Sequence, residues 1–382
     1  MAAPREPSQV VLVLQGGGAL GAYQIGVYQA LEEAGYLPDW VAGTSIGAIN
    51  AALIVGNEPS RRLAKMVEFW SMIQWPDILP AMPSGMMRDW ANGIAALQAA
   101  LFGQPKFFRP RFGNPWLSGS ALGLYDTQPL RATLESLIDF DLINAGPTRL
   151  SVGAVNVATG EPHYFDSARI SLGPEHILAS GALPPAFPPI EIDGAWYWDG
   201  GVVSNTPLDT VIDDRPRRSS LVFMVDLFAR PGTVPKSMAD VELRRNDINY
   251  APRSRRDIEK HRETHNLRRA VNVMWEHMPE NLKKDPRLLK CAELRCATTM
   301  QIVQIQSDFD GADGSGKDHD FSAATISQRH ASGYRDTCRL LEHQTWKDEP
   351  AGDLGLLVYG ASCSEAGAKR VRRSAAKVTV AA

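Results

Sequence analysis

The chain of 382 residues is 44% hydrophobic and 22% charged, a composition typical of a globular protein that can bury a large core. Its 40 basic and 43 acidic residues give a formal net charge of −3, which excludes a bulk field favouring nucleic acid or an anionic membrane. The four cysteines, Cys291, Cys296, Cys338 and Cys363, form no C-x-x-C pair and indicate neither a disulfide framework nor a zinc site.

Residues 1–9 are expected to form an N-terminal arm. They include Arg5 and Glu6 but no apolar run long enough for a signal peptide, and the apolar run at 10–14 is far too short to span a bilayer. Together with the cysteine pattern, this predicts a reduced, soluble and cytoplasmic protein.

The first fifty residues alternate between short apolar runs and helical patterns. Residues 10–14 are continuously apolar, as in a buried parallel strand, and a glycine-rich loop leads from them into an amphipathic helix predicted at 19–34. A second strand at 40–43 precedes an apolar helix at 48–55. The alternation predicts a three-layer α/β/α core with a mainly parallel sheet and helices on both faces.

Between residues 70 and 117 the composition changes, because tryptophan, phenylalanine and methionine are crowded together with several prolines. Five apolar residues at spacings of three and four predict one face of a helix: Met87, Trp90, Ile94, Leu97 and Leu101. A helical insertion packed on the core is one interpretation. The other is a mobile lid with an acyl-chain pocket, since methionine and tryptophan suit contact with a lipid tail.

Regular structure resumes with a helix at 127–137, which Thr127 is expected to cap. Further strands are predicted at 150–157, 164–165, 190–198 and 221–228. Asp193-Gly194 divides the third of these into a hairpin.

After residue 230 the sequence is charged and mostly helical. Helices are predicted at 258–278 and 321–341, with a strand at 302–305 between them, and the alanine-rich basic tail is expected to be disordered. Seven arginines cluster in this part: Arg244, Arg245, Arg253, Arg255, Arg256, Arg268 and Arg269. A solvated helix face and attraction to lipid head groups both fit that cluster.

Gly43-Thr-Ser-Ile-Gly47 lies between the second strand and the second helix and matches G-x-S-x-G. A nucleophilic serine at a tight strand-to-helix turn needs small neighbours, because the backbone must bend sharply and the substrate must reach the serine oxygen. The pattern therefore predicts Ser45 as a nucleophile. A glycine-rich turn with a capping serine is the alternative.

The earlier loop, Gly16-Gly-Gly-Ala-Leu-Gly21, matches G-x-G-x-x-G and allows two functions. A dinucleotide site needs an acidic residue after the second strand, but Asp39 precedes that strand. Consecutive glycine N–H groups backed by a helix N-terminus would instead hold the negative oxygen of a tetrahedral intermediate. Because loops after neighbouring parallel strands meet at one sheet edge, residues 16–18 are predicted to form an oxyanion hole beside Ser45.

A third motif, Asp199-Gly200-Gly201, follows the strand predicted at 195–198. A carboxylate just past a strand and before two glycines can reach a neighbouring loop without steric obstruction. A plain Asp-Gly turn is the alternative.

These three motifs, in this order, resemble the patatin-like phospholipase family, which combines a glycine-rich oxyanion loop, a G-x-S-x-G serine and a distant D-G-A/G aspartate. The resemblance extends from residue 10 to residue 228 and includes Ser204-Asn-Thr-Pro-Leu208. It divides the chain into a catalytic domain at 10–230 with the insertion at 70–117, a helical extension at 231–360 and a tail at 361–382.

Carried over by position, the resemblance implies Ser45 as the nucleophile, Asp199 as the base, and Gly17 and Gly18 as the main N–H donors. Many members of the family have arginine or lysine where this chain has Leu20. A basic contribution at the oxyanion loop is therefore missing or comes from elsewhere.

A free aspartate has a pKa near 4 and is a weak base for a hydroxyl. A Ser-Asp dyad can work if the two side chains are within hydrogen-bonding reach and the oxyanion loop stabilises most of the developing charge. The competing hypothesis is a Ser-His-Asp triad with His163 or His176 as the base. His176 lies in a stretch that favours a helix start, which indicates a surface or core role.

The resemblance implies a serine lipid acyl hydrolase, a phospholipase or esterase, that needs no cofactor or metal. Its partner would be a lipid or ester substrate and not nucleic acid, with peripheral membrane contact left open. Two alternatives remain: an intracellular polyester depolymerase or thioesterase with the same dyad, and a non-catalytic lipid-binding protein that keeps the fold.

Overall fold

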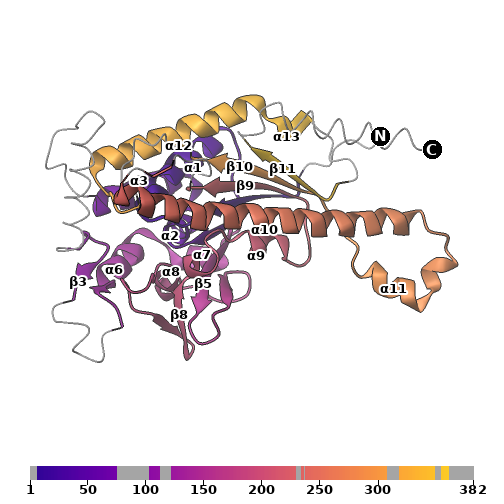
Figure 1. Ribbon diagram of the computed structural model, residues 1–382, viewed down its shortest axis with the longest axis horizontal. Coiled ribbons are helices and arrows are strands. Elements are labelled where there is room, and N and C mark those ends of the chain that lie inside the picture. The colour runs from indigo at the N-terminus through magenta and orange to yellow at the C-terminus, as the bar shows by residue number, and fades with distance from the viewer. Residues whose placement is uncertain are drawn as a thin grey trace.

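The computed structural model describes residues 7–74, 103–111, 122–228, 234–235, 237–307, 318–348 and 354–360. The helix face expected from Met87 to Leu101 and the tail at 361–382 lie outside these residues, as do the side chains of Arg253, Arg255 and Arg256. Helices cover both faces of a central, mostly parallel sheet, which confirms the predicted fold class (Figure 1).

In the described part of the chain the sheet has nine strands, ordered β11-β10-β9-β1-β2-β5-β8-β7, with β6 also paired to β5. The parallel strands are β1 (Gln9–Leu14), β2 (Trp40–Thr44), β5 (Arg149–Asn156), β9 (Ser220–Asp226), β10 (Met300–Gln306) and β11 (Leu356–Gly360). The antiparallel strands are β6 (Pro162–Asp166), β7 (Ile190–Ile192) and β8 (Ala195–Asp199). A separate hairpin pairs β3 (Arg109–Pro110) with β4 (Tyr125–Asp126).

The α-helices are α1 (Tyr23–Glu33), α2 (Ile46–Val55), α3 (Arg62–Ile73), α6 (Gln128–Leu137), α7 (Phe140–Ala145), α8 (Pro174–Ser180), α9 (Leu208–Ile212), α10 (Met238–Glu276), α11 (Pro286–Ala292), α12 (Ala323–His343) and α13 (Thr345–Asp348). Short 3-10 turns are η1 (Gly18–Ala22), η2 (Pro59–Arg61), η3 (Gly200–Val202) and η4 (Leu282–Lys284). None of the helices in these ranges combines the length and the apolar character needed to cross a bilayer.

The two faces of the sheet are both buried, which explains the unbroken apolar run of β1. Side chains alternate along a strand, so Leu12 and Leu14 pack with residues of α1 and α2 on one face. Val11 and Val13 pack on the other face with residues of α9 and with Ile258 of α10.

Every helix and strand that we predicted within the described residues is present. Asp193 and Gly194 both have positive φ, 51° and 78°, as a two-residue type I′ hairpin turn requires. The expected cap of α6 is wrong. Thr127 occupies the N-cap position without a side-chain bond, and the Asp126 carboxylate accepts the hydrogen bond from the Gln128 N–H at 3.0 Å instead.

The C-terminal part contributes to the sheet as well as adding helices. α10 begins at a capping box formed by Ser237 and Asp240, and β10 and β11 extend the sheet beyond β9. α12 lies along α1, as Figure 1 shows. The division at residue 230 remains a prediction, and the sheet runs across it.

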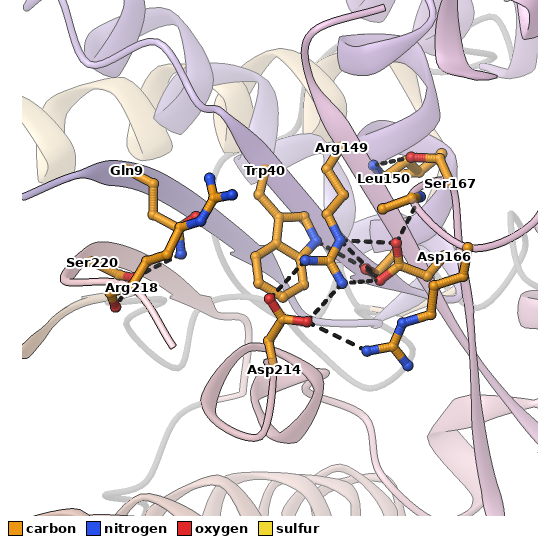
Figure 2. A network of polar contacts seen from close by, with 12 residues as sticks. Gln9, Trp40, Arg149, Leu150, Asp166, Ser167, Asp214, Arg218 and Ser220 are labelled. Carbon is orange, nitrogen blue, oxygen red and sulfur yellow. Dashed lines mark hydrogen bonds and ion pairs between the residues drawn. The ribbon is translucent and has the colours of Figure 1, made fainter. Parts of the chain in front are cut away.

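The amino-terminal edge of the parallel strands is braced by a polar network around Arg149 (Figure 2). Its guanidinium donates to Asp166 at 2.6 and 2.8 Å and to Asp214 at 2.8 and 2.9 Å, and lies 3.9 Å from the centre of the Trp40 ring. Burial alone would raise the pKa of Asp166, but the hydrogen bonds from Arg149 and from nearby donors such as the Ser151 hydroxyl lower it overall. The loops that carry the predicted site lie at the opposite, carboxyl ends of the parallel strands.

Candidate active site

Ser45 lies in the turn between β2 and α2 in a strained backbone conformation, with φ 56° and ψ −125°. Such a conformation costs on the order of 1–3 kcal/mol and persists only where the surroundings impose it. A Cβ on Gly43 would lie 2.3 Å from the Gly47 carbonyl oxygen, and a Cβ on Gly47 would lie 2.3 Å from that of Leu14. Close backbone packing therefore requires both glycines of the G-x-S-x-G motif.

Ser180, the last residue of α8, holds this turn in place. Its buried hydroxyl accepts a hydrogen bond from the Ser45 N–H at 2.9 Å and donates to the Gly153 carbonyl of β5 at 2.6 Å. Sequence reasoning missed Ser180 because no local pattern marks a serine whose partners are 135 and 27 residues away.

The register of the strands brings Ser45 and Asp199 together. Thr44 of β2 pairs with Gly153, and Asp199 of β8 pairs with the next residue, Ala154. Because β6 pairs with β5 on both sides of this point, it must occupy the other edge of β5. β2 and β8 therefore lie along the same edge of β5 and run in opposite directions, so that the carboxyl end of β2 meets the carboxyl end of β8.

Asp199 is 2% exposed. Its Oδ1 accepts a hydrogen bond from the Gly201 N–H at 2.7 Å, and the Ser45 side chain lies close enough to act on the carboxylate. Burial raises the pKa of Asp199 to about 6, and the Ser45 side chain and the Gly201 N–H partly oppose the shift. A Cβ on Gly200 would lie 2.7 Å from the Gly153 carbonyl oxygen, so this glycine permits the close approach of the two strand ends.

The glycine-rich loop lies directly beside Ser45. A Cβ built on Gly16 would lie 3.0 Å from the Ser45 Cβ and 2.4 Å from the Asn205 Oδ1. Asn205 binds the loop twice, since its backbone carbonyl accepts from the Gly16 N–H at 3.1 Å and its side-chain amide donates to the Gly16 carbonyl at 2.8 Å. Asn205 belongs to the Ser204–Leu208 segment that the family resemblance had included without a role.

The N–H groups of this loop are used unequally. Gly16 donates to Asn205 as above, and the Ala19 N–H donates to the Asp318 carbonyl at 2.9 Å. Within the described residues, neither the Gly17 nor the Gly18 N–H donates a hydrogen bond, and both residues are partly exposed. Two adjacent donors are therefore available to a ligand beside Ser45.

The buried side-chain amides of Gln15 and Asn50 fix the two ends of the glycine loop. The Gln15 side chain donates to Thr206 at 3.1 Å and accepts from the Leu227 N–H at 2.7 Å. Asn50 donates to the Gly21 carbonyl at 3.0 Å, which fixes the far end of the loop. Asn50 is the polar residue in the otherwise apolar sequence of α2, and this is the signal from which the network could have been predicted. In the structure Asn50 is fully buried.

The alternatives considered from sequence have no such support. The His176 Nδ1 accepts from the Gly173 N–H at 2.9 Å, and the His163 ring lies against Phe165. Among the described residues, neither histidine hydrogen-bonds to Ser45 or Asp199. The Asp39 carboxylate accepts from the Val10 N–H at 2.7 Å, at the sheet edge opposite the glycine loop, so it cannot serve a dinucleotide there.

Leu20, where many family members carry a cation, is fully buried in the core. Its backbone N–H donates to the Gly17 carbonyl at 3.1 Å. The side chain contributes packing beneath the loop and no charge toward it.

Comparisons with known proteins point to one family. A family model described as patatin-like phospholipase matches residues 12–212, and one described as patatin phospholipase matches residues 248–353. The lysophospholipase nte1 of Aspergillus terreus is 25% identical over 236 residues, which cover 60% of this chain and 13% of that protein. The patatin-like phospholipase domain-containing protein 7 of Mus musculus is 25% identical over 225 residues, 59% of this chain and 14% of that protein.

The match thus spans 13% and 14% of the lengths of these two curated relatives. Among solved structures, VipD from Legionella pneumophila aligns with 98% of this chain and 74% of its own, at 15% identity and a TM-score of 0.37.

Proposed function

Because this chain belongs to the patatin-like phospholipase family, we propose that it hydrolyses lipid esters with Ser45 as the nucleophile and Asp199 as the base. One observation carries the proposal: strand pairing brings Ser45, on a strained turn, beside the almost fully buried carboxylate of Asp199. The relatives whose names include lysophospholipase support a lipid ester as the substrate class.

In the proposed reaction, the Ser45 Oγ attacks the ester carbonyl carbon while its proton passes to Asp199. The Gly17 and Gly18 N–H groups donate to the carbonyl oxygen as it becomes negative. The C–O bond to the alcohol then breaks, the alcohol leaves with the proton from Asp199, and an acyl group remains on Ser45. Water attacks this acyl carbon, Asp199 takes its proton and returns it to the Ser45 oxygen as the carboxylic acid leaves.

Two features of the site make an aspartate a better base than its free pKa suggests. Burial raises the pKa of Asp199 to about 6, closer to neutral pH, where the carboxylate is both populated and more basic. The Gly17 and Gly18 amides, which donate to no described residue, would stabilise the oxyanion, and each such fixed donor contributes about 10²–10³ in rate.

The proposal is tested with p-nitrophenyl acyl esters and a lysophospholipid as substrates. Ser45→Ala and Asp199→Asn are each expected to abolish turnover while the circular dichroism spectrum stays that of the wild type. Ser136→Ala and Asp213→Asn are matched controls, because both residues are exposed, and they should retain full activity.

Labelling with a fluorophosphonate separates catalysis from lipid binding. The wild type should form a covalent adduct at Ser45, and Ser45→Ala should not. Full turnover in either the Ser45 or the Asp199 variant would refute the dyad. Hydrolysis of thioesters or polyesters with no action on lipids would place the same dyad on another substrate class.

A further inference from the structure

We propose that residues 318–321, far along the chain from the catalytic motifs, set the shape of the glycine loop and so position its N–H donors. Phe321 and the Asp318 carbonyl are the positioning groups. This inference rests on the proposed function for its kinetic consequences, but its structural part stands on contacts alone.

The Asp318 carbonyl contacts the glycine loop directly. It accepts the hydrogen bond from the Ala19 N–H at 2.9 Å, immediately after the two unengaged donors. Gly18 has a φ of +55°, and a Cβ there would lie 2.3 Å from the same carbonyl oxygen. The Asp318 carbonyl therefore contacts the turn at Gly18 and Ala19 and restricts its backbone conformation.

Phe321 supports the other end of the loop through Trp70. The two rings stack with centroids 6.1 Å apart and an interplanar angle of 20°, and Phe321 is 8% exposed. The Trp70 Nε1 donates to the Asn50 Oδ1 at 3.0 Å, and Asn50 in turn donates to the Gly21 carbonyl at 3.0 Å. Removing the ring of Phe321 would release the tryptophan that orients this amide.

The segment is itself rigidly anchored to α12. The Asp320 carboxylate accepts from the Ser322 N–H at 3.0 Å and from the Thr325 hydroxyl at 2.7 Å, and its backbone carbonyl accepts from the buried Arg329 at 3.2 Å. These bonds fix residues 318–321 relative to the helix.

α12 is in turn locked to α1, the helix that follows the glycine loop. A Cβ on Gly26 would lie 2.0 Å from the His330 carbonyl oxygen, and a Cβ on Gly333 would lie 2.0 Å from that of Tyr23. The Tyr23 hydroxyl also donates to Asp336 at 3.0 Å. The C-terminal part thus holds the loop at its glycines, at its end and through the next helix, which gives this part of the chain a role in the site.

The test compares Phe321→Ala with Trp346→Ala in the full-length protein. Trp346 is a matched control, because it is also a buried ring of the C-terminal part packed on aromatic residues, here Tyr36 and Phe223 at 6.4 and 5.9 Å. It lies beyond the other end of α12, away from the glycine loop.

Phe321→Ala is expected to lower kcat at least about tenfold with KM changed less than twofold, since a small displacement of oxyanion donors acts on the transition state. The affinity of an alkyl boronic acid, which adds to Ser45 and places a negative oxygen in the hole, should fall by the same factor as kcat/KM. Trp346→Ala should change neither quantity more than twofold. Equal kinetics in the two variants would overturn the inference.

Amide hydrogen exchange measures the hydrogen bonding of the glycine loop and does not depend on enzymatic activity. In Phe321→Ala the Ala19 amide should exchange at least about tenfold faster than in the wild type, and in Trp346→Ala it should not, because only the first change loosens the bond to Asp318. Unchanged exchange at Ala19 would refute the positioning role. If Phe321→Ala does not fold, Phe321→Leu, which keeps an apolar side chain without the ring, is measured in the same way.

The two proposals fail differently. Absence of Ser45-dependent hydrolysis in the wild type would refute the proposed function, and the exchange at Ala19 would still decide the positioning role. Hydrolysis that needs Ser45, together with wild-type kinetics and exchange in Phe321→Ala, would refute the positioning role alone.

Discussion

At the scale of single residues, the burial of Asp199 sets an expected pH dependence. Its carboxylate must be ionised to take the Ser45 proton, and burial raises its pKa to about 6. We therefore expect kcat/KM to rise with pH and to reach half of its plateau near pH 6, because kcat/KM reports the free enzyme. The measurement is a pH profile with an acyl ester, read at the isosbestic wavelength of the product.

A histidine base could produce a similar midpoint, so two variants serve as controls. His163→Gln and His176→Gln should retain the profile of the wild type, since neither ring hydrogen-bonds to Ser45 or Asp199. A midpoint near 4, or loss of the rise in either histidine variant, would contradict the assignment.

The same pKa shift predicts a cost in stability. The folded-state pKa of Asp199, about 6, lies above the unfolded value of about 3.9, so folding favours the protonated form. Below about pH 4 the carboxyl is protonated in both the folded and the unfolded state, and its burial carries no charge penalty. As the pH rises through 6 the buried group ionises, and the folded state loses stability relative to the unfolded state. Asp199→Asn should therefore be more stable than the wild type at pH 8, by up to about 3 kcal/mol, and less so at pH 5.

Urea unfolding at the two pH values measures this gain. Asp213→Asn, at an exposed position, should change the free energy of unfolding by less than about 0.5 kcal/mol at either pH. An Asp199 variant that is no more stable than the wild type at pH 8 would show that the buried charge carries no such cost.

A local sequence pattern singled out Ser45, and only the family resemblance singled out Asp199, whereas no pattern indicated Ser180 and Asn205. Ser45 stands out because its neighbours at 43 and 47 must be glycine for the turn itself to close. Ser180 and Asn205 act across 135 and 189 residues, on the Ser45 N–H and the Gly16 carbonyl, and nothing beside them in the sequence indicates those partners. Motif order indicated that Asp199 would reach Ser45, but the geometry comes from the pairing of β2 and β8 with β5.

At the scale of elements, hydrophobic patterns predicted most helices and strands but not how the C-terminal part joins the core. β10 was expected as a strand, yet its pattern does not say that it pairs with β9. β11 is only five residues long and was missed. The packing of α12 on α1 depends on Gly26 and Gly333, which lie about 300 residues apart and resemble ordinary helix-weakening glycines in the sequence.

This helix crossing predicts the effect of one added methyl group. Gly333→Ala should destabilise the protein by about 1–3 kcal/mol despite the better helix propensity of alanine, because its Cβ would lie 2.0 Å from the Tyr23 carbonyl oxygen and backbone must move. Gly360→Ala is the control, since the nearest atom to its Cβ would be 3.5 Å away. Chemical denaturation measures both, and a Gly333→Ala protein as stable as the wild type would contradict the tight crossing.

At the scale of the whole molecule, the two edges of the sheet have separate tasks. The carboxyl edge carries a strained serine and a buried carboxylate, both of which cost stability. The amino-terminal edge carries the Arg149 network, in which each charged group has partners (Figure 2). We infer that the second edge compensates for the first, so damage there should affect folding and spare catalysis.

Arg149→Met tests this division of roles. Removing the guanidinium leaves Asp166, which is 3% exposed, as an uncompensated buried charge, so we expect a loss of about 3–5 kcal/mol with kcat unchanged at a temperature where the variant is folded. Because Arg149 lowers the pKa of Asp166, the wild type should keep this stability above about pH 4 and lose it only as the pH falls further, whereas the variant should already be weakened at neutral pH.

Arg169→Met is the control within the same network. Arg169 is 65% exposed and contacts Asp214 at 3.4 Å, and an exposed ion pair of this kind contributes less than about 1 kcal/mol. The free energy of unfolding and kcat are measured for both variants from pH 4 to pH 8. A fall in kcat for folded Arg149→Met, or an equal loss of stability in the two variants, would contradict the separation of the braced edge from the catalytic one.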